Sequence, residues 1–459
     1  MGLNEECGVF GIYDVTGGCA KSACYGLYAL QHRGQEDCGI ATINNLELSC
    51  HKGTGLVGEV FTETILNELD GTMAIGHVRY AASSKLSKEN TQPLALKYIK
   101  GSLAVAHNGC LINGAELKRE YEYKGAVFHT TTDSEVIAYI IAQARLHSGS
   151  AEAAVNQAMK RLKGAYSLVV MSSRKLIAAR DPWGFRPLCI GRKGDAIVFA
   201  SESCALDSIE AAFVRDVEPG EIVWVNEGQL HSNRENCTNG KTSLCVFEHI
   251  YVARQDSVID GQSVYDARIL AGRYLAREHF IDADVVIGVP DSGLAAAKGY
   301  SLETGIPYND GFVMNRYIGR TFITPKQLSR EEAVKIKLNP LRATISGKRV
   351  VIIDDSIVRG TTVINKIKLL RDSGAKEIHM RISAPKFIAP CHFGTDIPSK
   401  KVLFAHKHST EEMRDIIGAD SLGFLGIDSL RKIAPNSKCG FCDACFTEEY
   451  PVVNATGQA

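Results

Sequence analysis

Short apolar runs, separated by glycine and polar residues, dominate the first half of the chain. Their length and residue types are typical of strands in antiparallel sheets. The runs are ECGVFGIYD, GIATI, GTMAIGHVRYA, GSLAVAHNG, AYSLVVMSS, LIAARDPWG and AIVFAS. Apolar residues at helical spacing interrupt them over residues 132–147 and 151–163. The pattern therefore predicts a layered α+β domain over residues 7–235.

The second half follows a different pattern, in which apolar strands alternate with helical stretches. Strands are predicted at 284–290, 350–355 and 377–383, with helices after the first two. Such alternation is typical of a parallel sheet with helices on both faces. The polar segment 231–243 has the weakest apolar pattern and is the predicted domain boundary. A second domain is therefore expected over residues 245–459.

The segment VVIIDDSIVRGTT, which starts at Val350, carries the most specific chemistry. A buried strand leads to a turn whose backbone N–H groups can face a phosphate, and a helix is predicted to start at Thr361 or Thr362. Gly374 stands where the helix should end. The adjacent acids of the strand end can accept hydrogen bonds from two sugar hydroxyls. The segment predicts a ribose 5-phosphate site.

Two other interpretations of this segment are weaker. A nucleoside triphosphate loop places a lysine after its last glycine, and Thr361 stands there instead. A buried strand capped by solvated acids would explain neither the adjacent acids nor the Gly-Thr-Thr run. A second strand end, VPDSG at 289–293, is expected at the same edge of the sheet, and this supports a ligand site there.

Length and charge narrow the possibilities. A chain of 459 residues exceeds the usual limit of one core, about 250 to 300 residues, so two domains are expected. Lysine plus arginine equals aspartate plus glutamate, 52 against 52, so no overall field favours nucleic acid or a membrane as partner. No apolar run is long enough for a membrane span, and the start MGLNEEC lacks the features of a secretory signal. A cytoplasmic protein with small-molecule partners follows.

The fourteen cysteines are many for a cytosolic chain, so the grouped ones are expected to bind a metal or to catalyse. Cys439, Cys442 and Cys445 lie at three-residue intervals, and this spacing fits zinc and a four-iron cluster equally. Cys7 opens an apolar strand after six residues. If those six are removed, its thiol gains a free α-amino group that can act as its base. The alternative is a buried strand cysteine.

Four motifs follow one another in the first half of the chain: QHRGQE at 31–36, GHVRYA at 76–81, HNG at 107–109 and TTDSE at 131–135. In this order they resemble the glutamine-hydrolysing domain of the N-terminal-nucleophile amidotransferases. The resemblance implies a four-layer αββα fold, a propeptide at residues 1–6 and a catalytic nucleophile at Cys7. Taken singly, Arg79 and Asp133 could be a structural ion pair, and HNG could be only a turn.

The same resemblance implies the other residues of a glutaminase site. Asn108 and the backbone N–H of Gly109 would form an oxyanion hole, which stabilises the oxygen that becomes negative when the thiol attacks the amide. Arg79, Tyr80 and Asp133 would bind glutamine. Arg79 would hold the α-carboxylate and Asp133 the α-amine, roles that suit their charges.

The DDSIVRGTT motif resembles the phosphoribosyl pyrophosphate (PRPP) signature of the type I phosphoribosyltransferases. The resemblance implies an α/β domain with a parallel sheet, in which the acids hold the ribose hydroxyls and the loop holds the 5-phosphate. Residues 315–340 resemble a cationic loop that closes over PRPP, although a solvated basic loop is the alternative. Mg²⁺ would lie near Ser292, Asp354 and Asp355. The implied PRPP-binding residues are Asp291, Ser292, Arg320, Lys326, Lys337, Asp354, Asp355, Ser356, Arg359, Gly360, Thr361 and Thr362.

The two halves together resemble the glutamine-PRPP amidotransferases of purine nucleotide synthesis, in their iron–sulfur-containing type. The resemblance implies that ammonia from glutamine is transferred to carbon 1 of PRPP, giving 5-phosphoribosylamine, glutamate and pyrophosphate. It also implies feedback inhibition by purine nucleotides and a homotetramer. A [4Fe-4S] cluster would be bound by Cys245, Cys391, Cys439 and Cys442, with Cys445 left over.

Three alternatives would share only one half of the chain with this family, and the regulator among them belongs to a different functional class. An enzyme that aminates a sugar phosphate would share the first half of the chain. A catalytically silent PRPP-binding regulator would share the second half, but Cys7 with its oxyanion partners is complete and the chain has no basic recognition element. An attached ATP-pyrophosphatase would need a Ser-Gly-Gly-rich loop that is absent here.

Overall fold

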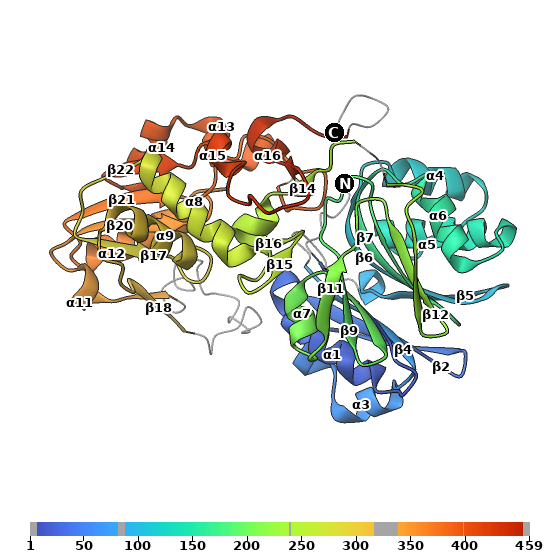
Figure 1. Ribbon diagram of the computed structural model, residues 1–459. Coiled ribbons are helices and arrows are strands. Elements are labelled where there is room, and N and C mark those ends of the chain that lie inside the picture. The colour runs from blue at the N-terminus through green and yellow to red at the C-terminus, as the bar shows by residue number, and fades with distance from the viewer. Residues whose placement is uncertain (1–6, 81–87, 238–239, 316–337, 398, 453–459) are drawn as a thin grey trace.

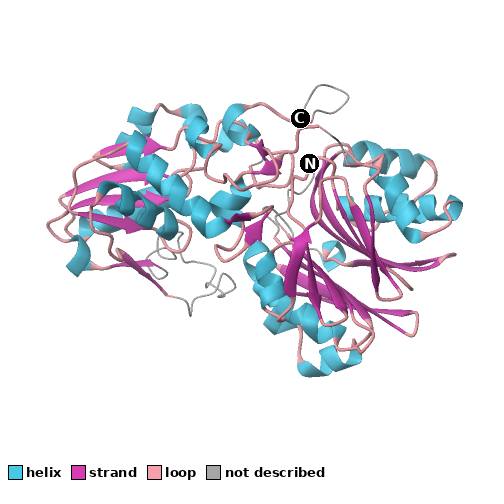
Figure 2. Ribbon diagram, in the orientation of Figure 1, coloured by secondary structure: helices cyan, strands magenta, loops and turns pink. Residues whose placement is uncertain are grey.

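The computed structural model describes residues 7–80, 88–237, 240–315, 338–397 and 399–452. Figure 1 shows two halves side by side, with the sheets of the N-terminal half at the right and the C-terminal half at the left. Strands and helices are separated into layers in both halves (Figure 2). Among the described residues, no helix is long and apolar enough to cross a membrane.

Two antiparallel sheets form the N-terminal half. The first has the order β11-β9-β10-β1-β4-β2-β3 and the second the order β13-β12-β8-β7-β6-β5. The strands of the first are β1 (Gly8–Tyr13), β2 (Asp37–Asn44), β3 (Glu47–Thr54), β4 (Met73–Arg79), β9 (Cys189–Lys193), β10 (Ala196–Ala200) and β11 (Ala212–Asp216). Those of the second are β5 (Leu94–Tyr98), β6 (Gly101–Leu111), β7 (Gly164–Ser172), β8 (Leu176–Arg180), β12 (Ile222–Asn226) and β13 (Gln229–Asn233).

Successive side chains along the strands are apolar on both faces of each sheet, and both faces are therefore buried. In β1, Val9 packs in the core between the sheets, whereas Phe10 packs against helix α1 (Cys19–Ala29). In β6, Ala104 lies between the sheets, whereas Leu103 faces the outer helices. Successive strand residues point to opposite faces, so an apolar run buries both. The result is the predicted four-layer αββα fold. The outer helices on the second sheet are α4 (Gly114–Tyr123), α5 (Asp133–His147) and α6 (Ala151–Met159).

The C-terminal half contains the predicted parallel sheet, in the order β17-β20-β21-β22. All four residues from Val350 to Ile353 are fully buried, so both faces of β20 are covered. The fourth strand, β22, has weak apolar character and was not predicted. The strands are β17 (Val285–Gly288), β20 (Arg349–Asp354), β21 (Glu377–Ile382) and β22 (Ser421–Phe424), and the main helices are α8 (Val264–Glu278), α9 (Leu294–Thr304), α12 (Thr361–Asp372) and α14 (Thr410–Ile417).

Helix α12 begins and ends where the sequence predicts. It starts at Thr361, directly after Gly360, which has a φ of 81°. At the other end, Gly374 has a φ of 90°, and the N–H of Ala375 reaches back to the carbonyl of Leu370. This left-handed residue after the last turn is the usual helix terminator.

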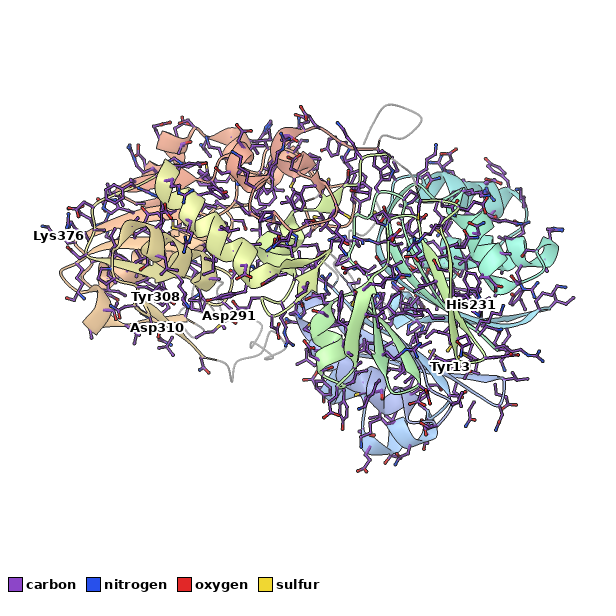
Figure 3. The ribbon with its side chains drawn as sticks, in the orientation of Figure 1. Tyr13, His231, Asp291, Tyr308, Asp310 and Lys376 are labelled. Atoms are coloured by element: carbon purple, nitrogen blue, oxygen red, sulfur yellow. The ribbon has the colours of Figure 1, made fainter. Side chains whose placement is uncertain are left out.

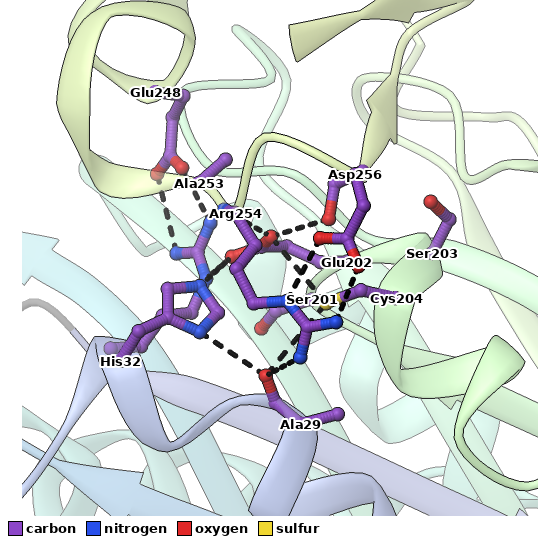
Figure 4. Close-up of polar contacts among 12 residues, drawn as sticks. Ala29, His32, Ser201, Glu202, Ser203, Cys204, Glu248, Ala253, Arg254 and Asp256 are labelled. Atoms are coloured by element: carbon purple, nitrogen blue, oxygen red, sulfur yellow. Dashed lines mark hydrogen bonds and ion pairs between the residues drawn. The ribbon is translucent and has the colours of Figure 1, made fainter. Parts of the chain in front are cut away.

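Buried ion pairs join the two halves of the chain. Arg33 contacts Glu202 of its own half, and its Nη2 lies 2.5 Å from Oε2 of Glu248 in the other half. Arg186 contacts the second oxygen of Glu248 at 3.0 Å, and the four side chains are at most 1% exposed. Glu202 also accepts hydrogen bonds from His32 and the backbone of Arg254 (Figure 4).

A second buried ion pair also joins an arginine of the N-terminal half to an acid of the C-terminal half. Arg180 of the N-terminal half contacts both oxygens of Asp260 at 2.9 and 2.8 Å. In each of these interdomain pairs the arginine comes from the first half and the acid from residues 248–260. Because an unpaired charge is costly in such a position, the pairs hold the two halves in one relative arrangement.

Candidate functional sites

Cys7 is fully buried and directly precedes β1, which lies between β10 and β4 in its sheet. Gly8 pairs with Val78, so the next step along the ladder brings Cys7 level with Arg79. Arg79 in turn pairs with Asp37 on β2, and its Nη1 lies 3.0 Å from the carboxylate. The structure thus brings the predicted nucleophile and the predicted carboxylate-binding cation to one edge of the sheet. Asp37 was not predicted, because no motif signals it.

Asn108 lies on β6, where it is fully buried. Within the described residues, neither its side-chain oxygen nor its nitrogen has a hydrogen-bond partner. A buried amide without partners is destabilising, and such groups are rare away from functional sites. Both polar atoms of this amide are therefore available for a hydrogen bond to a substrate.

Gly109 has a φ of 141°, and an added Cβ would lie 2.1 Å from the carbonyl oxygen of Ala165. No other residue fits without moving β7. The contact between Nε2 of His77 and the carbonyl of His107, at 3.1 Å, joins β4 to β6 directly before Asn108. The strand of Arg79 and the strand of the predicted oxyanion hole are therefore neighbours in adjacent layers.

Asp133 is the first residue of α5, and its Oδ2 accepts the N–H of Leu111 at 2.8 Å. Leu111 ends β6, so this acid is attached to the strand that carries Asn108. Desolvation raises the pKa of the Asp133 carboxyl above its usual value, with the Leu111 N–H acting against it. Tyr80 is half-buried and follows Arg79 at the end of a described segment.

The predicted PRPP site lies at the carboxyl ends of β17 and β20, which are neighbouring parallel strands. Oγ of Ser292, from the first strand end, donates to Oδ1 of Asp355 at 2.6 Å, and Ser356 donates to the other oxygen. Asp291, from the same loop as Ser292, lies at the lower edge of the C-terminal half (Figure 3). The two strand ends that were predicted separately thus form one site.

Asp354 makes a contact that the sequence did not signal. Its Oδ2 accepts a hydrogen bond from Nζ of Lys366 on α12 at 2.5 Å, and its Oδ1 accepts the N–H of Asp355. Burial raises the pKa of the Asp354 carboxyl to about 6, and the Lys366 cation acts in the opposite direction. Lys366 therefore favours the charged form of a carboxylate that would otherwise be protonated more readily.

The loop after Asp355 leads into the N-terminus of α12, where N–H groups without helical partners favour an anion. The φ of Gly360 is positive, and an added Cβ would lie 3.0 Å from the ring of Phe404, so this turn favours glycine. Arg359, Thr361 and Thr362 lie in or directly after the turn. The predicted lid residues Arg320, Lys326 and Lys337 lie outside the described residues.

Comparison with known proteins agrees with this geometry. The model of the glutamine amidotransferase domain matches residues 77–208, and that of the phosphoribosyl transferase domain matches residues 262–386. The amidophosphoribosyltransferase of Methanocaldococcus jannaschii is 46% identical over 97% of this chain and 97% of its own length, and that of Bacillus subtilis is 47% identical over 98% and 95%.

The chain belongs to the amidophosphoribosyltransferase family.

Two solved structures share the fold of this chain over nearly its whole length. One is described as the allosteric regulatory enzyme of purine biosynthesis, with 45% identity and a TM-score of 0.91 over 98% of this chain and 97% of the other. The other is the glutamine PRPP amidotransferase of B. subtilis complexed with ADP and GMP, with 45% identity and a TM-score of 0.90 over 99% of each chain. The resemblance to this family is confirmed.

In this amidophosphoribosyltransferase-family chain, four cysteines line one cavity at the domain junction. They are Cys245, Cys391, Cys442 and Cys445, and aromatic rings including Phe185, Phe393 and Tyr450 complete the lining. The parallel pair of β14 (Leu244–Cys245) and β23 (Phe441–Cys442) places the first and third of these cysteines opposite each other. Within the described residues, no three histidine, cysteine or acidic side chains are arranged to hold a single metal ion.

The cavity differs from the predicted cysteine set at one position. Cys439 precedes β23 and packs instead with Leu244 and Ile259. Cys445 follows β23 on the short helix α16 (Ala444–Thr447), and its carbonyl accepts the N–H groups of Ile388 and Ala389. Although the two cysteines are equally spaced from Cys442 in sequence, only Cys445 lines the cavity.

Proposed function

We propose that the chain hydrolyses glutamine at Cys7 and transfers the ammonia to carbon 1 of PRPP. The products are 5-phosphoribosylamine, glutamate and pyrophosphate, in the first step of purine synthesis. The observation that carries the proposal is the buried amide of Asn108 on β6, for which the described part of the chain supplies no hydrogen-bond partner. Buried ion pairs join the half of the chain that carries this site to the half that carries the Ser292–Asp355 contact.

The glutaminase half acts through a free N-terminus in this proposal. Removal of residues 1–6 leaves an α-amine on Cys7, which takes the thiol proton and later delivers it to the leaving ammonia. Arg79 holds the α-carboxylate of glutamine, Asp133 holds the α-amine and Tyr80 contributes to binding. Asn108 Nδ2 and the Gly109 N–H stabilise the oxyanion of the tetrahedral intermediate.

The PRPP half binds and orients its substrate. Asp354 and Asp355 accept hydrogen bonds from the ribose hydroxyls, and the turn from Ser356 to Thr362 binds the 5-phosphate through its N–H groups. Asp291 and Ser292 lie at the pyrophosphate. Arg320, Lys326 and Lys337 are proposed to close over the bound substrate and to exclude water.

Magnesium is proposed at the same strand ends. Ser292, Asp354 and Asp355 present oxygen atoms, the ligands that Mg²⁺ prefers, and the 2.6 Å contact between Ser292 and Asp355 already draws two of them together. When bound with PRPP, the ion would supply positive charge for the departing pyrophosphate.

Inhibition by purine nucleotides and assembly into a homotetramer are also proposed. A 45% identical relative is complexed with ADP and GMP, and this supports purine nucleotides as inhibitors. The homotetramer, the cytoplasmic location, the propeptide at residues 1–6 and the division into domains at 7–235 and 245–459 remain predictions.

The test of the coupled reaction uses the purified chain with glutamine, PRPP and Mg²⁺. We expect glutamate and pyrophosphate in equal amounts, and we expect glutamate release to fall sharply when PRPP is omitted. Ammonium chloride in place of glutamine should also yield pyrophosphate. Glutamate release without any pyrophosphate would contradict the proposal, because ammonia would then have another acceptor.

A [4Fe-4S] cluster is proposed at the cysteine-lined cavity, with Cys245, Cys391, Cys442 and Cys445 as its ligands. Four thiols round one cavity suit a cluster with one iron for each cysteine. The Sγ of Cys391 accepts N–H groups from Phe393 and Thr395 at 3.4 Å each, contacts that favour a thiolate. Burial raises the pKa of Cys245 to about 12, so metal binding must displace its proton.

Two serine variants test the ligand set. We expect Cys445→Ser to lose most of the iron and the visible absorption of the cluster after anaerobic purification, because one ligand at the cavity is removed. Cys439→Ser is the matched control, only six residues away, and should retain both. If only Cys439→Ser loses iron, the ligand set predicted from the sequence, which contains Cys439 in place of Cys445, is the correct one. Zinc in place of iron in the unmodified protein would overturn the cluster itself.

A further inference from the structure

Two buried amide side chains, Asn90 and Gln92, lie just before strand β5, and each makes two hydrogen bonds to a neighbouring segment. Neither residue belongs to a motif that the proposed reaction uses. The segment that Gln92 contacts is followed directly by Asn108, and the segment that Asn90 contacts leads to Asp133. Both partners therefore adjoin groups of the proposed glutaminase site.

Gln92 substitutes for a strand at one residue of β6. Leu94 of β5 pairs with Val105, so two further steps of the same ladder would place Gln92 opposite His107. The ladder ends at Leu94, and the Gln92 side chain supplies the missing bonds. Its Oε1 accepts the N–H of His107 at 2.8 Å, and its Nε2 donates to the carbonyl of the same residue at 3.4 Å.

The position of the Asn108 amide depends on this backbone. Because the amide has no partner of its own among the described residues, its own hydrogen bonds cannot orient it. The carbonyl of His107 is held by Gln92 and by Nε2 of His77 at 3.1 Å. An oxyanion donor must lie within a few tenths of an ångström of its place to be effective, so the backbone before it has to be fixed.

Asn90 acts in the same way on the segment before α5. Its Oδ1 accepts the N–H of Thr131 at 3.1 Å, and its Nδ2 donates to the hydroxyl of Thr131 at 3.0 Å. Glu135 holds the adjacent part of the segment, where it accepts N–H groups from His129 and Thr130. Residues 129–131 are thus attached from two directions, and Asp133 follows two residues later.

We propose that Asn90 and Gln92 are positioning residues for glutamine hydrolysis, of which Gln92 acts through Asn108 and Asn90 acts through Asp133. The inference rests on the proposed roles of those two residues. The two residues lie in one short segment but control different kinetic parameters. Gln92 affects stabilisation of the transition state, whereas Asn90 affects binding of the substrate amine.

The experiment measures glutamine hydrolysis in the presence of PRPP, and ammonia-dependent pyrophosphate release as a readout of the other half. Gln92→Leu conserves volume and removes both hydrogen bonds. We expect kcat for glutamine to fall about 10- to 100-fold, with KM changed less than about 2-fold. Asn90→Leu should raise KM about 10-fold and leave kcat within about 2-fold. Asn90→Asp keeps two acceptors for Thr131 and should restore most of the affinity.

The matched control is Gln262, another buried glutamine whose amide makes two backbone hydrogen bonds, to Ser263 and Asn436. Gln262→Leu should lower the melting temperature and leave both glutamine parameters unchanged. If Gln92→Leu does not fold, Gln92→Glu is measured instead. This variant keeps the hydrogen bond from the His107 N–H, so a smaller fall in kcat is expected.

Two results would overturn the inference. One is equal loss of the glutamine and ammonia reactions, which would show a purely structural role. The other is unchanged glutamine kinetics in folded variants. A failure of the proposed function looks different, because the unmodified chain would then release either no glutamate or glutamate without pyrophosphate.

Discussion

Cys7→Ser is expected to abolish glutamine-dependent pyrophosphate release, with a loss of at least about 10³-fold, while ammonia-dependent release stays within about 2-fold. The hydroxyl is a far weaker nucleophile than the thiol, and removing a nucleophile from an intact site costs several orders of magnitude. In the proposed mechanism, the ammonia reaction depends on the strand ends at Asp354 and Asp355 and not on Cys7. The two rates are measured on the same preparation, so folding is checked by the second rate.

Cys24→Ser provides the matched control for this variant. Cys24 is a buried cysteine of the same half, on helix α1, and its substitution should leave the glutamine rate within about 2-fold. The mass of the active protein should also correspond to a chain that begins at Cys7. Full glutamine hydrolysis by Cys7→Ser, or by a chain that retains Met1 to Glu6, would exclude the N-terminal nucleophile.

Glu248→Gln is expected to destabilise the junction of the two halves by about 3 to 5 kcal/mol. The substitution removes a buried charge that faces both Arg33 and Arg186, and two buried cations are then left without full compensation. Hydrogen exchange of the peptide that covers residues 248–257 measures the local effect. Unfolding of a two-domain chain need not be two-state, so a local measurement is preferred to one melting curve.

An exposed ion pair is the control for the Glu248 prediction. Glu235 contacts Lys160 at 2.6 Å, with both side chains 52% exposed. Glu235→Gln should leave exchange at the junction unchanged, because solvent screens such a pair. If both variants behave alike, the buried pairs do not determine the arrangement of the halves.

Segments with strict periodicity were predicted well, because one local pattern is enough to specify them. The alternation in GSLAVAHNG corresponds to β6, and the helical spacing after Thr361 corresponds to α12, including its end at Gly374. Segments whose burial depends on distant partners were missed. Strand β22 contains SLGF, a run too short and too mixed to be recognised without β21 beside it.

The candidate sites show the same division between local and long-range information. The motifs at Cys7, Asn108 and Asp354 mark chemistry that is local in sequence. Lys366 was missed although it lies only twelve residues from Asp354, because nothing in that spacing shows which helix face meets the strand end. Asn90 and Gln92 were missed for a similar reason, since their partners Thr131 and His107 are brought near only by the fold.

The sequence by itself determined the two fold classes and the family, and it predicted the residues with reactive groups, because these depend on periodicity and on short motifs. Only the tertiary structure decided which cysteines share a cavity, since Cys439 and Cys445 are equally spaced from Cys442 and only Cys445 lines the cavity with it. It also decided that buried arginines of one half meet acids of the other. Such contacts join residues as much as 215 positions apart, and no local pattern records them.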